Sequence, residues 1–132
     1  MIVPGGVPEV AVVRVLVVDD QAPFLRAMTS VVEETDGFEV VGQAESGEES
    51  LVVAAAVRPD LVLMDVNLPG IDGLEATRRL RAGDSPPVVL LLSTYDEDAG
   101  EVFVAESGAA AYVTKSAFGP DRLEHVWFTA VR

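Results

Sequence analysis

Residues 61–75 of the chain read LVLMDVNLPGIDGLE. The first four, Leu61–Met64, form a continuous apolar run, which is typical of a strand buried on both faces in a parallel sheet. An aspartate, Asp65, follows this run directly. After a short loop, apolar residues recur at helical spacing from Leu74 onward, and Gly83 is expected to end that helix. The stretch therefore predicts a buried strand, an acidic loop and a helix in succession.

The same succession recurs on both sides of this stretch. The predicted strands are Val12–Val18, Phe38–Val41, Leu61–Met64, Val88–Leu92 and Ala110–Val113. Helical patterns lie between these strands, and the first begins at Pro23 and ends at Gly37. The next is capped by Ser46 and Glu49 and stops before Pro59. Two more follow, one from about Asp98 to Glu106 that ends at Gly108 and a last one that begins near Pro120. Strand and helix alternate five times, which predicts a doubly wound α/β domain.

The composition excludes several classes of protein. The chain has 132 residues, enough for one domain, and 49% of them are hydrophobic. Its formal net charge of −13 would repel nucleic acid phosphates and anionic lipids, so we expect no direct nucleic acid binding and no membrane binding. Cysteine is absent, which excludes disulfides, thiolate metal sites and cysteine nucleophiles. No apolar run approaches the ~20 residues of a bilayer span, and no secretory signal is recognisable, so we expect a cytoplasmic protein.

The single histidine, His125, lies on the last predicted helix and far in sequence from every strand end. A catalytic triad of serine, histidine and aspartate would depend on it. We therefore interpret His125 as a solvated helix residue and do not expect a hydrolase.

Polar side chains follow four of the five predicted strands. These residues are Asp19, Asp20, Asp65, Ser93, Thr94, Thr114 and Lys115. Ligands of open parallel sheets bind beyond the carboxyl ends of the strands, so we expect these groups to meet at one edge. Three carboxylates close together repel one another unless cations compensate them, and hard oxygen ligands favour Mg²⁺. Metal, carboxylate, lysine and hydroxyl together are the components of a phosphoryl-transfer site, in which a carboxylate can itself be the nucleophile.

With these residues at its strand ends, the chain resembles the receiver domains of two-component response regulators. The resemblance is carried by VLVVDDQ at 15–21, LVLMDVNLPGIDGLE at 61–75, LLST at 91–94 and AAYVTKS at 110–116, in the order and at the spacing of that family. It covers about residues 12 to 131, with residues 1–11 as an N-terminal extension. The sequence of these segments is most similar to that of regulators that carry a LuxR-type DNA-binding tail. The resemblance implies a chemotaxis-receiver-like, flavodoxin-like fold, with five parallel strands in the order 2-1-3-4-5 and five flanking helices.

The resemblance also implies a role for individual residues. Asp65 matches the phosphoacceptor, and Lys115 matches the lysine that pairs with a phosphoryl oxygen. Asp20 matches a direct Mg²⁺ ligand, together with Asp65 and the backbone carbonyl of Asn67, whereas Asp19 matches a ligand one shell out. The remaining implied roles are those of Ser93, the switch hydroxyl, and Tyr112, the aromatic that moves inward on activation.

Some of these assignments have alternatives. Thr94 is a second hydroxyl beside the expected site, although the spacing favours Ser93. Ser116 follows Lys115 where the family often has proline, so a cis peptide bond is not expected there. Tyr95 can overhang the phosphoryl group while Asn67 leaves room for water, so both are expected to set the lifetime of the phosphorylated form. The alternative for Tyr112 is a strand aromatic that stays packed in both states.

The predicted function is therefore that of a signalling switch. A sensor histidine kinase is the expected partner, Mg²⁺ the cofactor, and the face formed by the fourth helix, fifth strand and fifth helix the output surface, with a possible homodimer. Such a domain catalyses only its own phosphorylation and dephosphorylation. An aspartyl phosphatase of the haloacid dehalogenase type is disfavoured, because Asn67 stands where it needs an acid. A phosphate-independent receiver would require a lost site residue, and none is lost. The chain could be a stand-alone regulator or the N-terminal part of a transcriptional regulator.

Overall fold

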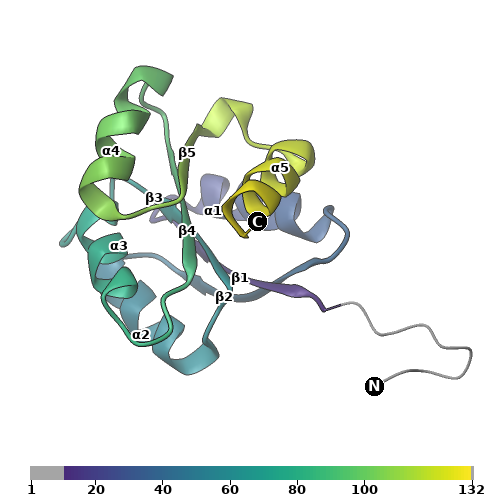
Figure 1. Ribbon diagram of the computed structural model, residues 1–132, viewed down its shortest axis with the longest axis horizontal. Coiled ribbons are helices and arrows are strands. Elements are labelled where there is room, and N and C mark those ends of the chain that lie inside the picture. Colours follow the sequence, from purple (N-terminus) through teal and green to yellow (C-terminus); the bar gives the residue numbers. More distant parts are fainter. Residues whose placement is uncertain (1–10, 132) are drawn as a thin grey trace, which may run out of the picture.

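A parallel five-stranded sheet forms the centre of the molecule (Figure 1). The computed structural model describes residues 11–131. Its strands are β1 (Val13–Val18), β2 (Phe38–Ala44), β3 (Leu61–Asp65), β4 (Val88–Ser93) and β5 (Ala111–Thr114). Their order in the sheet is β2-β1-β3-β4-β5, and every neighbouring pair is parallel. The predicted fold class and strand order are confirmed.

Five α-helices cover the two faces of this sheet, and their ranges are α1 (Ala22–Glu33), α2 (Gly47–Val57), α3 (Gly73–Arg81), α4 (Gly100–Ser107) and α5 (Pro120–Val131). Two short 3₁₀ helices, η1 (Glu97–Ala99) and η2 (Lys115–Ala117), precede α4 and α5. α1 and α5 bury Met28, Val32, Leu123 and Val126 against one face of the sheet. α2, α3 and α4 pack on the opposite face (Figure 1). Because both faces are covered, the central strands β1, β3 and β4 are almost wholly buried, as their continuous apolar runs predict.

The caps of α2 and α4 follow the sequence signals. The Ser46 hydroxyl accepts a 3.0 Å hydrogen bond from the Glu49 backbone N–H, as a capping box requires. The return bond differs from that pattern, because the Glu49 carboxylate accepts from the Glu45 N–H at 2.6 Å. α4 ends at Gly108, whose φ of +83° is the left-handed conformation that glycine adopts at little cost.

The end of α1 differs from the prediction. The helix stops at Glu33 rather than at Gly37. The Thr35 hydroxyl donates to the Val31 carbonyl at 2.6 Å, and the Phe38 N–H donates to the Thr35 carbonyl, so the chain has already left the helix there. Gly37 has a φ of +87° in the turn that leads into β2. The glycine therefore marks a turn between helix and strand and does not cap the helix.

The last helix orients its two adjacent aromatic residues differently. Trp127 is half-buried and packs edge-on against Phe38, with ring centroids 6.4 Å apart. Phe128 is 58% exposed. Adjacent helical residues point about 100° apart, so only one of the two can face the core.

The predicted N-terminal extension, residues 1–11, lies outside the described residues except for Ala11.

Candidate phosphoryl-transfer site

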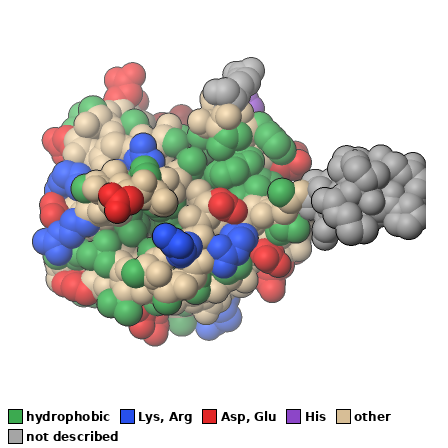
Figure 2. Space-filling model, turned by 60° about the horizontal axis from the view of Figure 1, so that its bottom comes forward, with side chains coloured by type: hydrophobic (Ala, Val, Ile, Leu, Met, Phe, Trp, Pro, Cys, Tyr) green, Lys and Arg blue, Asp and Glu red, His purple; other side chains and the backbone are tan. Residues whose placement is uncertain are grey.

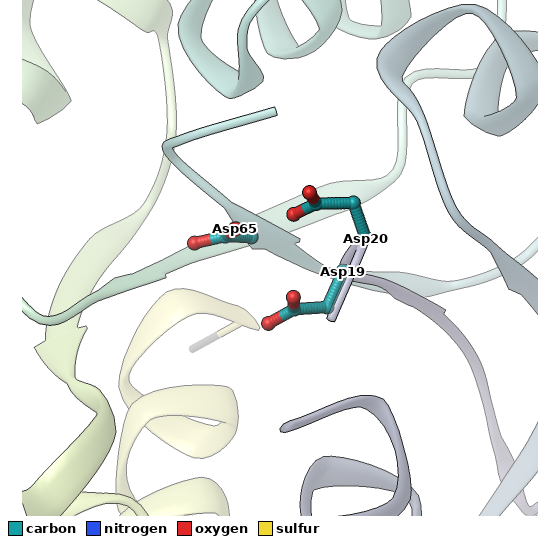
Figure 3. A group of neighbouring side chains, drawn as sticks. All are labelled: Asp19, Asp20 and Asp65. Carbon is teal, nitrogen blue, oxygen red and sulfur yellow. The ribbon is translucent and has the colours of Figure 1, made fainter. Parts of the chain in front are cut away.

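Three carboxylates meet at the carboxyl ends of two neighbouring strands. Asp19 and Asp20 follow β1 directly, and Asp65 is the last residue of β3. β1 and β3 are paired, with Val18 opposite Met64, so their ends lie side by side. One carboxylate oxygen of each residue lies within 4.8 Å of the others. Figure 3 shows the three side chains at these strand ends, with their carboxylates turned toward the same side.

The three carboxylates differ in their surroundings. Asp19 is fully buried, and its Oδ1 accepts a 2.9 Å hydrogen bond from the Gln21 N–H, which holds the turn between β1 and α1. Asp65 is only 3% exposed, whereas Asp20 is exposed. The site is thus formed by two buried acidic groups and one that faces solvent.

Lys115 supplies the opposite charge. It follows β5 directly, and its Nζ lies 2.7 Å from Asp19 Oδ2 and 3.4 Å from Asp65 Oδ1. The lysine side chain is 9% exposed, so these ion pairs are shielded from water. The same Nζ lies 3.9 Å from the centroid of the Phe24 ring, which belongs to the first turn of α1. The ammonium group is therefore enclosed by two carboxylates and one aromatic face.

The charge state of Asp65 reflects this crowding. Burial, and next the negative charge of Asp19, raise the pKa of Asp65 from its ordinary value of 3.8 to about 6. Lys115 and the backbone N–H of Asn67 act in the opposite direction by stabilising the carboxylate. Asp65 is therefore ionised at neutral pH and can act as a nucleophile.

The carboxylate oxygens of this site are suitable ligands for a divalent cation. Asp19 Oδ2 is buried, and its charged partner within residues 11–131 is the Lys115 ammonium at 2.7 Å. A single ammonium leaves three acidic groups undercompensated. Carboxylate oxygens are the ligands that hard divalent cations prefer. The acidic cluster of Asp19, Asp20 and Asp65 could therefore bind a metal.

The end of β4 carries the two candidate switch hydroxyls. Ser93 is fully buried, and its Oγ accepts a 3.3 Å hydrogen bond from the Tyr95 N–H. Thr94 is exposed. In the sheet register Asp65 pairs with Leu92, so Ser93 stands one residue beyond the phosphoacceptor candidate on the adjacent strand. This position favours Ser93 over Thr94.

Aromatic residues connect this strand end with α4. The Tyr95 hydroxyl donates to Asn67 Oδ1 at 3.4 Å, so the half-exposed ring reaches over the loop that follows Asp65. The Phe103 ring of α4 packs against the rings of Tyr95 and Tyr112, with centroids 5.8 Å and 5.6 Å away. Burial raises the pKa of the Tyr112 phenol, and the nearby Ser93 hydroxyl partly offsets this effect. Tyr112 is therefore a partly buried ring in this structure, packed against Phe103 of α4.

Two residues near the site are not indicated as functional by the sequence analysis. Phe24 fits the apolar pattern of α1, and nothing in the sequence indicates its contact with Lys115. A Cβ at Gly73 would overlap the Asp65 carbonyl oxygen, so the loop can return to α3 this tightly only with glycine. The second glycine of the segment GIDG is the one available signal for this close approach.

Other features lie away from the carboxylates. A hollow of about 880 Å³ is lined by Pro59, Asp60 and Val88, at the opposite ends of the strands. On the face shown in Figure 2, acidic and basic side chains are interspersed with apolar ones. His125 is exposed on α5, as expected from the sequence.

Among the described residues every peptide bond is trans, including the one between Lys115 and Ser116.

The chain is similar to proteins of one known family. The family profile of the response regulator receiver domain matches residues 15–127. Response regulator GacA of Pseudomonas viridiflava is 47% identical over 105 residues, which cover 80% of this chain and 49% of GacA. Response regulator UvrY of Escherichia coli O6:H1 is 35% identical over 105 residues, which cover 80% of this chain and 48% of UvrY. The chain thus spans about half the length of these curated relatives.

Solved structures show the same architecture. A LuxR-family response regulator from Aurantimonas sp. SI85-9A1 superposes with a TM-score of 0.81 at 29% identity, covering 92% of this chain and 86% of that one. The response regulator domain of Thermotoga maritima CheB gives a TM-score of 0.77 at 28% identity, covering 92% and 98%. None of the helices within residues 11–131 has the length and apolar character that crossing a membrane requires. The match over residues 15–127, together with the strand order and the polar strand ends, establishes that this chain belongs to the response regulator receiver domain family.

Proposed function

We propose that Asp65 accepts a phosphoryl group from the phosphohistidine of a sensor histidine kinase. The observation that supports this most directly is the position of Asp65, buried at the end of β3 beside the acidic pair of β1 and 3.4 Å from the Lys115 ammonium. A carboxylate in this position is ionised at neutral pH and has a cation ready for the incoming charge. Membership of the receiver family makes this reaction the expected one.

The transfer exchanges one bond for another. An Asp65 carboxylate oxygen attacks phosphorus, the phosphorus–nitrogen bond breaks, and its electron pair remains on the imidazole of the kinase, leaving an acyl phosphate on Asp65. Lys115 pairs with a phosphoryl oxygen as this charge arrives. The ammonium already lies between Asp19 and Asp65, so little rearrangement of the side chain is needed. The same groups serve hydrolysis of the acyl phosphate, and the domain turns over no other substrate.

We further propose Mg²⁺ as the cofactor of this site. Asp20, Asp65 and the backbone carbonyl of Asn67 would hold it, with Asp19 acting through an intervening water. When bound, Mg²⁺ supplies positive charge that neutralises the oxygens of the transferring phosphoryl group. The exposure of Asp20 leaves it free to serve as a ligand, whereas Asp19 is already engaged with Lys115 and Gln21.

The output surface is proposed to be the face formed by α4, β5 and α5. The acyl phosphate attracts the Ser93 hydroxyl, and its movement stabilises the packed position of Tyr112, so phosphorylation shifts the population between two arrangements of α4. Contact between Tyr112 and the first residue of α4, Gly100, provides the mechanical connection. This surface would serve a protein partner or a second copy of the chain. Nucleic acid binding by this chain alone is not expected at a net charge of −13.

Chemical phosphorylation tests the central proposal. Incubation with acetyl phosphate and Mg²⁺ should add the mass of one phosphoryl group, located at Asp65 by peptide mapping. Asp65→Asn should not be labelled at that position, and neither should the wild type in EDTA. Full labelling of either sample would show that another residue or a metal-independent reaction is responsible.

A further inference from the structure

The Lys115 ammonium has three close neighbours, and one of them is apolar. Asp19 Oδ2 and Asp65 Oδ1 lie 2.7 Å and 3.4 Å away, and the Phe24 ring centroid lies 3.9 Å away. A cation this close to an aromatic face is attracted by the negative potential of the ring, most strongly where water is excluded. The lysine side chain is 9% exposed, so water is largely excluded here.

Phe24 is not placed as an ordinary core residue. It is half-buried, and within residues 11–131 it does not belong to the side chains that pack against either core cluster. Its neighbour Leu25 does pack against the core, together with Met28 and Val32 of the same helix. The ring of Phe24 thus points to the end of the sheet, where its contact is with the lysine.

The backbone around Phe24 holds the ring in this place. The Gln21 N–H donates to Asp19 Oδ1, and Pro23 stands in the first turn of α1, which fixes the entry of the helix beside the carboxylates. Asp19 therefore anchors the helix that carries Phe24 with one oxygen and contacts Lys115 with the other.

We propose that Phe24 is a positioning residue for Lys115. Its ring face holds the ammonium between Asp19 and Asp65, so that the cation stays beside the phosphoacceptor instead of turning into solvent. A lysine side chain has four rotatable bonds, and two ion pairs on one side leave the opposite side open to water. The ring of Phe24 covers that side without adding another charged group to the site. The proposal rests on the function proposed above for Asp65 and Lys115, and it adds a residue that acts through the lysine.

The first experiment observes the contact without phosphate. Lys115 is the only lysine of the chain, so protein labelled with ¹³C-lysine gives the signals of this residue alone. The protons next to Nζ should resonate upfield of free lysine, because they lie over the ring. Phe24→Leu should abolish the upfield shift and Phe24→Tyr should restore it. Leu25→Ala, which weakens the packing of the same helix, should lower the melting temperature and leave the shift in place. Equal lysine spectra in the wild type and Phe24→Leu would overturn the proposal.

The second experiment measures the consequence. Phenylalanine with one, two or three ring fluorines, incorporated at position 24 of the full chain, keeps the shape of the ring and progressively weakens its attraction for a cation. In the presence of Mg²⁺, affinity for beryllofluoride should fall in steps, by about fivefold in total, as expected for a partly shielded cation–π contact. A merely structural role of the ring would leave the affinity unchanged across the series, and that result would refute positioning.

The two experiments separate this proposal from the proposed function. If wild-type protein fails to bind beryllofluoride at all, the phosphoacceptor function is wrong, and the lysine spectra still decide whether Phe24 holds Lys115. If the wild type binds and the fluorinated series does not differ, the function stands and the role of Phe24 is wrong.

Discussion

The phenolic oxygen of Tyr112 donates a 2.8 Å hydrogen bond to the backbone carbonyl of Tyr95. This bond connects β5 to the loop between β4 and α4. Tyr95 in turn reaches Asn67, two residues beyond Asp65, through its own hydroxyl. The position of Tyr112 and the cover over the phosphoacceptor are therefore coupled through one residue.

The lifetime of phosphorylated Asp65 should depend on Tyr95. Its ring lies over the loop at Asn67 and hinders water from approaching in line with the acyl phosphate. Tyr95→Ala should change the hydrolysis rate several-fold, with acceleration expected from the loss of this cover. Tyr95→Phe keeps the ring and loses only the hydroxyl, so it should stay closer to the wild type. Decay can be followed by radioactive or mass-based assay, and identical rates for Tyr95→Ala and wild type would place the ring elsewhere in solution.

Binding of Mg²⁺ should depend more on Asp20 than on Asp19. Asp20 is exposed and unengaged by Lys115, whereas Asp19 already has Lys115 at 2.7 Å. We expect Mg²⁺ to raise the melting temperature of the wild type, Asp20→Ala to lose most of this rise, and Asp19→Ala to keep part of it. Asp121→Ala removes an exposed carboxylate from α5 and controls for general cation effects. An equal rise in the wild type and Asp20→Ala would contradict the ligand assignment.

The stability of the metal-free protein should fall as the pH rises through the titration of Asp65. Its pKa of about 6 lies above the ordinary value of 3.8, so the native state binds this proton more tightly than the unfolded chain does. This contribution to stability is fully present below pH 4 and is lost as the pH approaches 6 and above. Asp65→Asn removes the buried charge, and at pH 7.5 it should raise the free energy of unfolding by about 1–3 kcal/mol relative to the wild type.

Denaturant unfolding in EDTA at several pH values measures this difference. The gain from Asp65→Asn should shrink toward zero near pH 4, where wild-type Asp65 is already neutral. A gain that does not vary with pH would mean that Asp65 titrates normally.

Communication from Asp65 to the output face should require Ser93. Beryllofluoride should shift amide resonances across residues 93–128 in the wild type and change the exposure of Tyr112. Ser93→Ala should reduce both responses while acetyl phosphate still labels Asp65. Thr94→Ala changes an exposed neighbouring hydroxyl and should leave the responses intact. If beryllofluoride binds and the shifts remain confined to the vicinity of Asp65, the coupling is absent.

Gly100 should be required for the packing of Tyr112 on α4. A Cβ at this position would lie 2.7 Å from Tyr112 Cδ2, which forces the ring or the helix to move. Gly100→Ala should therefore destabilise the fold by about 1–3 kcal/mol despite the better helix propensity of alanine. At Gly83 a Cβ would meet only the Leu80 carbonyl, at 3.7 Å, so Gly83→Ala is the matched control and should be neutral. Thermal unfolding followed by circular dichroism compares the two variants, and equal stability would show that Tyr112 has room to shift.

The order of the elements and the positions of the acidic residues along the chain were determined by the sequence itself. Continuous apolar runs predict buried parallel strands, because a sheet covered on both faces selects apolar residues on both sides of each strand. The polar residues that follow those runs must then share one edge, since all parallel strands end on the same side. Local signals predicted the caps at Ser46 and Gly108 but failed at Gly37, because a glycine with positive φ serves a turn as well as a helix end.

Only the tertiary structure decided which side chains touch. Lys115 contacts Asp19 across the sheet, and Phe24 covers the lysine ammonium. Tyr95 reaches Asn67. These contacts follow from the twist of the strands and the rotamers of long side chains. These depend on packing between elements that are distant in sequence, and no local pattern encodes them. The raised pKa of Asp65 has the same origin, since burial and the charge of Asp19 act on it only once β1 and β3 lie side by side.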